Sequence, residues 1–233
     1  MLGLFERKEK KCLVDECMPV TEARYVVVDT ELTGLDGKKD SIVSLGAVRM
    51  AGGRLNVGNT FYRLVSPESE LSAKSIVIHE ITPSDVAAKP AIGAVLRDFT
   101  EFCGDDIVVG HFVSIDLEFI NRELLRTRGS GLPNRVVDTF SVYEWLRKRS
   151  ASRTGEAPRQ TSFRLYDIVK EFGIPVNGAH NALMDAFITA QLFQRFIPLL
   201  AGMGAVELGE LLRIGSPFKG GDRFRLTGEF GNF

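Results

Sequence analysis

Two kinds of hydrophobic spacing alternate along the chain and predict which segments form strands and which form helices. Residues 25–28 read Tyr-Val-Val-Val, a short β-branched run without alternation that is typical of a strand buried on both faces. Two further strand-like runs, at about 41–50 and 54–65, are separated by a pair of glycines. We expect these three segments to be consecutive antiparallel strands.

The spacing changes after residue 90, where the apolar positions follow the helical period through about residue 102. Short apolar runs at 107–109 and 136–137 predict a fourth and a fifth strand. Further helices are expected at about 114–129 with Ser114 as the N-cap, and at about 139–149, 162–172 and 182–199. Three strands followed by alternating helices and strands indicate an α/β fold, with a mixed five-stranded sheet flanked by helices.

Length and composition add the domain organisation. The chain has 233 residues with 44% apolar content, enough for one α/β domain with a full core. We divide it into a polar N-terminal arm (1–22), one α/β domain (23–199) and a C-terminal extension of unknown role (200–233). Three cysteines without C-x-x-C spacing are typical of a reducing compartment, so we expect a cytoplasmic location. No run reaches the ~18 apolar residues that cross a bilayer, and we expect no membrane partner.

Charge leaves the class of partner open. The chain has 29 basic and 30 acidic residues and a net charge of −1, which neither indicates nor excludes a nucleic acid. One stretch differs, because residues 147–164 carry six basic residues and one acidic residue. We expect a loop-rich segment in which Arg147, Lys148 and Arg149 contact a substrate backbone. The alternative is a solvated surface loop.

The first candidate for chemistry is Asp29-Thr30-Glu31, directly after the first strand. Side chains at i and i+2 of an extended chain share a face, so the two carboxylates point the same way. Active sites of open α/β sheets lie at such strand ends. Adjacent carboxylates repel unless a cation lies between them, and Mg²⁺ and Mn²⁺ prefer oxygen ligands. A metal site is one interpretation, and a solvated strand end is the other.

The chain contains an internal control for this motif. Residues 136–139 repeat the Val-Val-Asp-Thr of residues 27–30, but Phe140 stands where the glutamate would be. Without the second carboxylate, we interpret Asp138 as a strand-end residue or a helix cap and not as a metal ligand.

Two further acidic positions open helices. Asp116 falls in the first turn of the helix that follows the fourth strand, where aspartate is favourable in any protein. His180 precedes Asp185 by five residues, a spacing that does not place both side chains on one helix face. We therefore expect His180 in the loop, Asn181 or a neighbour as the helix cap, and Asp185 on the helix. Each feature alone is also explained by helix capping.

Taken together, the acid pair, the later aspartate and the His-x4-Asp segment have the order of the three motifs of the DEDDh exonucleases. The chain resembles that family, including the DnaQ-like proofreading subunits, from about Arg24 to Phe196. Residues 29–35 resemble its first motif, and residues 162–165 through 172–175 resemble the helix that leads into the third. Residues 180–192 resemble the third motif itself. The fold that this resemblance implies is ribonuclease H-like.

The resemblance implies roles for five residues. Asp29, Glu31 and Asp185 would bind one divalent cation, and Asp29 with Asp116 would anchor a second, as Mg²⁺ or Mn²⁺. His180 would take the proton from the attacking water, since imidazole suits base catalysis near neutral pH.

The resemblance also implies a substrate pocket. Glu31, Leu32, Thr33 and His180 would line the site of the terminal nucleotide, and the product would be a nucleoside 5′-monophosphate. One departure is Phe112, where the family commonly has asparagine. Phe112 puts substrate preference or strand geometry in doubt more than it does catalysis.

Three functions remain open at this point. The leading one is a 3′→5′ exonuclease acting on single-stranded or frayed DNA 3′ ends, alone or as a proofreading activity beside a DNA polymerase subunit. The second is an exoribonuclease, which would need a group that reads the 2′-OH. The third is a non-catalytic nucleic-acid-binding or polymerase-scaffolding protein, and retention of all five chemical residues argues against it.

Overall fold

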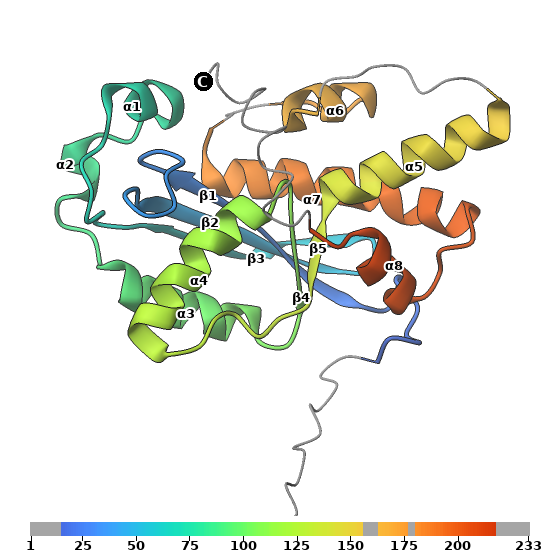
Figure 1. The fold of residues 1–233 in the computed structure, drawn as a ribbon, viewed down its shortest axis with the longest axis horizontal. Helices are drawn as coiled ribbons and strands as arrows, with labels where there is room; N and C mark the ends of the chain where they lie inside the picture. Colours follow the sequence, from blue (N-terminus) through green and yellow to red (C-terminus); the bar gives the residue numbers. More distant parts are fainter. Residues whose placement is uncertain (1–14, 156–162, 177–179, 218–233) are drawn as a thin grey trace, which may run out of the picture.

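A five-stranded sheet runs through the middle of the protein, with helices on both faces (Figure 1). The computed structural model describes residues 15–155, 163–176 and 180–217. The strands are β1 (Arg24–Leu32), β2 (Ile42–Ala51), β3 (Arg54–Leu64), β4 (Ile107–Gly110) and β5 (Val136–Asp138).

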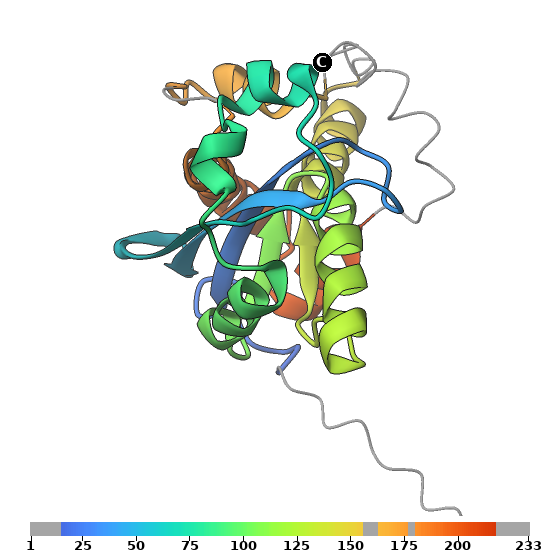
Figure 2. The ribbon, with the colours of Figure 1, turned by 90° about the vertical axis from the view of Figure 1, so that its left-hand side faces the viewer.

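The strand order in the sheet is β3-β2-β1-β4-β5. The first three strands pair antiparallel, as predicted, whereas β4 pairs parallel to β1 and β5 parallel to β4. The expected mixed five-stranded sheet is therefore confirmed. Part of the edge strand β3 extends beyond the helices (Figure 2). Because β1 has a strand on either side, the residues at its end are surrounded by neighbouring elements.

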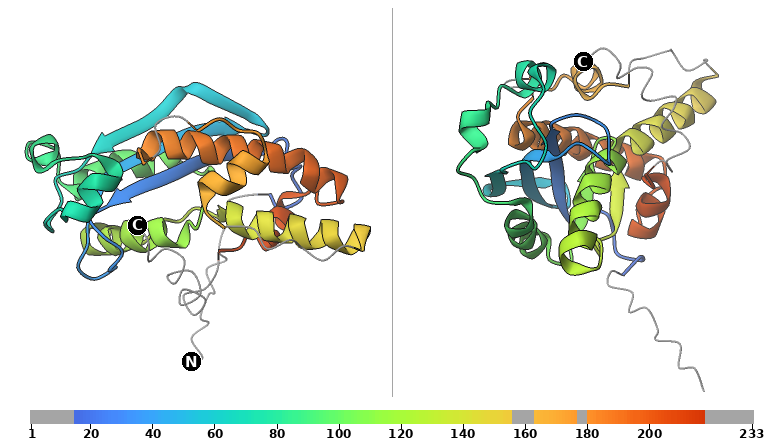
Figure 3. Two further views of the ribbon diagram at one scale, coloured as in Figure 1. Left: turned by 90° about the horizontal axis from the view of Figure 1, so that it is seen from above. Right: turned by 60° about the vertical axis from the view of Figure 1, so that its left-hand side comes forward.

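Alternate residues of β1 face two separate hydrophobic cores, which explains its continuous apolar run. Tyr25 and Val27 belong to the core beneath α5, α7 and α8, and Val26 and Val28 belong to the core beneath α3 and α4. Figure 3 shows these two helical layers on opposite sides of the sheet. The helices are α1 (Ala73–His79), α2 (Pro83–Val86), α3 (Ile92–Cys103), α4 (Ser114–Arg128), α5 (Thr139–Thr154), α6 (Leu165–Glu171), α7 (Ala182–Gly202) and α8 (Leu208–Ile214).

Three details of the helices differ from the prediction. The expected loop at 147–164 is wrong for its first part, because α5 continues to Thr154 and ends at Gly155, whose φ of 73° suits a helix C-cap. Residues 156–162 of that stretch lie outside the described residues. Ser114 is the first residue of α4, and Val113 is its N-cap. Helices α1 and α2, beyond the end of β1 (Figure 1), and α8 near the C-terminal end of the described chain were not predicted, since each is very short.

Segments from both ends of the described chain pack side by side. Pro19 forms an isolated bridge with Glu207, and the Leu208 N–H donates to the Met18 carbonyl at 2.8 Å. Val20 and Leu208 are both buried in the core beneath α7. The domain boundaries at 22/23 and 199/200 stay a prediction. None of the helices in the described segments is long and apolar enough to cross a membrane.

Candidate active site

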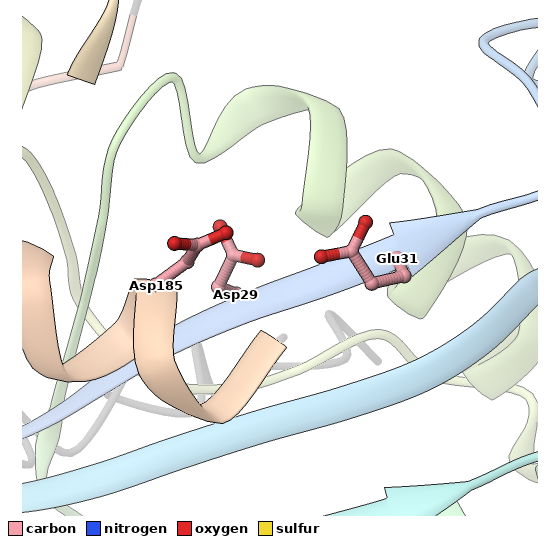
Figure 4. A group of neighbouring side chains, drawn as sticks. All are labelled: Asp29, Glu31 and Asp185. Carbon is pink, nitrogen blue, oxygen red and sulfur yellow. The ribbon is translucent and has the colours of Figure 1, made fainter. Parts of the chain in front are cut away.

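Three carboxylates meet near the C-terminal end of β1, which continues to Leu32, so that Asp29 and Glu31 lie within the strand and not after it as predicted. Oxygens of Asp29, Glu31 and Asp185 all lie within 4.8 Å of one another. Figure 4 shows Asp29 and Glu31 on β1 with their carboxylates directed toward that of Asp185 on α7. The prediction that the two β1 acids share a face is confirmed, and the face is the one that α7 covers.

A glycine lets α7 come close enough to deliver Asp185. Gly46 is the β2 residue paired with Asp29, and a Cβ at Gly46 would collide with the backbone of Ala182 and Leu183 at the start of α7. The Asn181 side chain caps this helix by accepting from Leu183 N at 3.2 Å, as the sequence predicted. Helix and strand therefore meet backbone to backbone, and Asp185, in the first turn, lies beside Asp29.

Asp116 reaches the site from the opposite face of the sheet. It lies in the first turn of α4 and is buried, and its Oδ1 accepts a hydrogen bond from Thr30 Oγ1 at 2.6 Å. Thr30 stands between Asp29 and Glu31 on β1, so its side chain points to the α4 side. The aspartate is close enough to raise the pKa of both β1 acids through charge repulsion.

All four carboxyl groups have raised pKa values, and burial is the largest cause for each. Burial raises the pKa of Glu31 to about 8 and that of Asp116 to about 7. The pKa of Asp29 is raised by burial and then by repulsion from Asp116, Glu31 and Asp185, and that of Asp185 is raised by burial. None of these four carboxyl groups can supply a positive charge to offset the negative charge of the others. Their hard oxygen donors fit a divalent cation, and the acidic cluster can hold a metal ion.

His180 lies outside α7, immediately before the N-cap residue Asn181, as the five-residue spacing predicted. Its φ is 62°, in the left-handed region that histidine adopts more often than most residues. The His180 backbone N–H donates to Asp185 Oδ2 at 3.1 Å and to the hydroxyl oxygen of Tyr166 at 2.9 Å. The histidine therefore belongs to the same cluster as the carboxylates.

Tyr166 is a neighbour of the site that the sequence did not reveal. Its hydroxyl on α6 lies 2.9 and 2.8 Å from the two carboxylate oxygens of Asp185, and its ring packs edge-on against the His180 ring at 5.2 Å. The tyrosine precedes His180 by 14 residues, and no local periodicity links them. Only the packing of α6 beside α7 brings this side chain to the carboxylates.

The unusual Phe112 has a structural explanation. Its φ is 51°, a left-handed conformation that asparagine tolerates and that is uncommon for a bulky residue. The Phe112 N–H donates to Asp138 Oδ1 at 3.1 Å, and its ring packs against those of Phe140 at 4.4 Å and His111 at 4.7 Å. Aromatic packing and a buried carboxylate hold the backbone where the family commonly has asparagine.

The expected pocket residues at the end of β1 have contacts within the fold. Thr33 is buried, and its hydroxyl donates to Asp40 Oδ1 at 3.0 Å while accepting from Ser41 N at 3.0 Å. Leu32 is half-buried against the core beneath α3 and α4. Their role toward a substrate stays a prediction.

The basic residues on α5 lie apart from the carboxylates in the chain and are partly neutralised. Arg147 and Lys148 each form an ion pair with Glu144, both at 3.0 Å. Arg149 is exposed. Their expected contacts with a substrate backbone also stay a prediction.

Comparison with known proteins places this site in a family. The model of an exonuclease family named for RNase T matches residues 26–193. The ε subunit of DNA polymerase III from Aquifex aeolicus is 34% identical over 176 residues, which cover 76% of this chain and 81% of that protein. The PolC-type DNA polymerase III of Thermotoga maritima is 31% identical over 193 residues, 83% of this chain, which spans only 13% of that polymerase.

Solved structures agree with the sequence comparison. Exonuclease X, in complex with 5′-overhanging duplex DNA, is 25% identical with a TM-score of 0.59, and the match covers 82% of this chain and 99% of that one. E. coli exonuclease I with a dT13 oligonucleotide is 19% identical with a TM-score of 0.66, covering 78% of this chain and 43% of that one, and it confirms the ribonuclease H-like fold. The chain therefore belongs to the RNase T exonuclease family.

Proposed function

We propose that this chain is a divalent-metal-dependent 3′→5′ exonuclease that releases nucleoside 5′-monophosphates from DNA 3′ ends. The observation that carries the proposal is the convergence of Asp29, Glu31 and Asp185 within 4.8 Å, with Asp116 beside them and His180 bonded to Asp185. Carboxylates beside a histidine, in a member of an exonuclease family, suit phosphodiester hydrolysis.

Two cations, Mg²⁺ or Mn²⁺, would be held by the four carboxylates. Asp29, Glu31 and Asp185 would provide one set of ligands, and Asp29 with Asp116 would provide the other. When bound, a pair of such ions stabilises the attacking and leaving oxygens of an in-line displacement. Thr30 would keep Asp116 oriented through the hydroxyl bond of 2.6 Å.

His180 would act as the general base toward the attacking water. It stands off α7, so its side chain is not confined to the helix face that carries Asp185. Glu31, Leu32 and Thr33, at the end of β1, would line the pocket of the terminal nucleotide together with His180.

DNA is the favoured substrate because relatives that match over most of this chain are a PolC-type DNA polymerase III and a DNA polymerase III ε subunit. A proofreading role beside a DNA polymerase follows from the same names. An RNA substrate is the second candidate, since a 3′-exonuclease described as recognising the histone mRNA stem-loop shares the fold at 16% identity and a TM-score of 0.59.

The deciding experiment offers purified protein 5′-labelled single-stranded DNA, frayed duplex DNA and RNA of one sequence, with Mg²⁺ or Mn²⁺. We expect stepwise shortening of DNA from its 3′ end, no hydrolysis in EDTA, and recovery when metal is restored. Faster shortening of RNA would replace DNA by RNA as the substrate. Hydrolysis that survives exhaustive chelation would refute the metal-dependent mechanism.

The base is tested by His180→Ala at saturating metal. Loss of a general base lowers kcat by ~10²–10⁴-fold, and KM should change far less, because His180 is one of four residues expected to line the nucleotide pocket whereas proton transfer would depend on it alone. A kcat close to wild type would exclude His180 as the base.

The basic segment of α5 is tested by the salt dependence of binding to single-stranded DNA. Each lost phosphate contact lowers the slope of log K against log salt by ~0.7. Since Glu144 already pairs with Arg147 and Lys148, we expect this change for Arg149→Gln and little change for Lys148→Gln. If the wild type and both variants have equal slopes, this segment does not contact the phosphate backbone and is a solvated surface.

A further inference from the structure

The hydroxyl of Tyr166 contacts both Asp185, on α7, and His180, the residue just before the N-cap of α7. Tyr166 Oη lies 2.8 Å from Asp185 Oδ2 and 2.9 Å from Oδ1, and it accepts the backbone N–H of His180 at 2.9 Å. A phenol has one proton to donate and lone pairs to accept with. Its donor is therefore used on the Asp185 carboxylate, and an acceptor position is used on the His180 backbone.

The tyrosine ring adds a second contact with the same histidine. It meets the His180 ring at a centroid distance of 5.2 Å and an interplanar angle of 81°. The His180 backbone has a φ of 62° and lies outside the helix, so no intrahelical hydrogen bond holds it. Tyr166 and Asp185 instead accept its N–H.

Helix α6 is anchored without this hydroxyl. Ile168 and Val169 are fully buried in the core beneath α7, and Tyr143 on α5 donates to Glu171 Oε2 at 2.7 Å. The bonds of Tyr166 to the site are thus additional to those that dock α6. This separation makes it possible to remove the hydroxyl and leave the helix in place.

We propose that Tyr166 is a positioning residue that orients the Asp185 carboxylate for metal binding and fixes the His180 backbone for proton transfer. The inference rests on the proposed function of Asp185 and His180. Hydrogen-bond partners behind a metal ligand orient it and raise its affinity for the ion, and their loss typically costs ~10–100-fold in metal affinity or activity. Here one side chain performs this for a ligand and for the base together.

The test is Tyr166→Phe, which removes the hydroxyl and keeps the ring against His180. We expect the Kd for Mn²⁺, measured by calorimetry without substrate, to rise ~10-fold. At saturating Mn²⁺, kcat on a single-stranded oligonucleotide should fall ~10-fold with KM unchanged. The matched control is Tyr143→Phe, which removes another phenol-to-carboxylate bond at the far end of α6. The control should leave Mn²⁺ affinity and kcat at wild-type values.

A double-mutant cycle separates the two effects. In a His180→Ala background, Tyr166→Phe should cause no further loss of kcat at saturating Mn²⁺, while the loss of Mn²⁺ affinity should persist. Wild-type Mn²⁺ affinity in Tyr166→Phe, or an equal fall of kcat in both backgrounds, would overturn the proposal. If the wild-type protein hydrolyses no nucleic acid, the proposed function fails, and Mn²⁺ binding alone decides whether Tyr166 orients Asp185.

Discussion

The same four residues, Val-Val-Asp-Thr, occur at two strand ends of this sheet and lead to different outcomes. On β1, Asp29 meets Glu31 and Asp185 and forms the carboxylate cluster. On β5, Asp138 caps α5 by accepting from Phe140 N at 2.9 Å and also accepts from Phe112 N at 3.1 Å. Burial raises the pKa of both aspartates, that of Asp138 to about 7. The four shared residues and a raised pKa therefore do not distinguish the two aspartates.

The two strand ends differ in the course of the backbone after the aspartate and in the groups that surround it. β1 stays extended through Glu31 and Leu32, which puts a second acid on the face of the first, whereas β5 ends at Asp138 and a helix begins at once. β1 lies in the middle of the sheet and β5 at its edge. Backbone N–H groups surround Asp138, and other carboxylates surround Asp29, so only the β1 site favours a cation.

The same substitution made at both strand ends should separate the two aspartates most strongly. Asp29→Asn should lower kcat by ~10³-fold or more, because a metal supplies several kcal/mol of transition-state stabilisation. Asp138→Asn should stay near wild type, since an amide oxygen can accept both N–H groups that now bond to Asp138 Oδ1. Oligonucleotide hydrolysis and thermal melting measure this, and equal activity of the two variants would erase the distinction.

The next effect tests whether backbone contact with α7 is the feature that sets the β1 end apart. Gly46→Ala would push the start of α7 away from β2, and a displacement of about 1 Å can cost ~10²-fold in rate. Gly58→Ala on β3 is the matched control, because a Cβ there meets its nearest atom only at 3.8 Å. Similar kcat values for both variants would show that the α7 approach does not set the geometry.

A smaller effect concerns the pH dependence of stability without metal. The pKa of Glu31 is raised from 4.5 to about 8 in the folded protein, so the carboxyl group is easier to ionise in the unfolded chain. The contribution of the protonated Glu31 carboxyl to the free energy of unfolding is therefore fully present below about pH 4.5, and it is lost as the pH rises to about 8.

Glu31→Gln should therefore gain stability over wild type across this window. We expect a gain on the order of 2 kcal/mol, since one pKa unit is worth ~1.4 kcal/mol and neighbouring carboxyls share the protons. Urea unfolding in EDTA at about pH 5 and about pH 8 measures it, on either side of most of the titration. If wild type and Glu31→Gln differ in free energy of unfolding by the same amount at both pH values, the raised pKa of Glu31 is contradicted. Added Mg²⁺ should make the wild type the more stable of the two at the higher pH.

The smallest effect concerns the cap of α5. Asp138→Ala removes the acceptor for two N–H groups and should lower the free energy of unfolding by ~1–2 kcal/mol, the usual loss for an N-cap. Its kcat per folded molecule should change far less than that of Asp29→Asn. Denaturant unfolding and hydrolysis assays on the folded fraction check this, and a thousandfold loss of kcat would assign Asp138 to the catalytic machinery.

The secondary-structure elements and the local geometry of the motifs could be predicted from the amino-acid sequence. Continuous apolar runs and the helical period predicted all five strands and the longer helices, because burial on a regular backbone repeats with the backbone. The i and i+2 rule placed Asp29 and Glu31 on one face, and the five-residue spacing placed His180 off α7. Asp138 was predicted as a cap or strand-end residue because the second acid is absent there, and it is a cap.

Contacts between residues far apart in the chain could not be predicted, because they depend on how the helices pack on the sheet. Thr30 bonds Asp116 across 86 positions because alternate residues of β1 face different helical layers, and Gly46 admits α7 because it pairs with Asp29. Tyr166 reaches Asp185 through the docking of α6, and the extent of α5 is set by its cap at Gly155. Local patterns report the period and burial of one element, but contacts between elements depend on packing, which no short stretch of sequence contains.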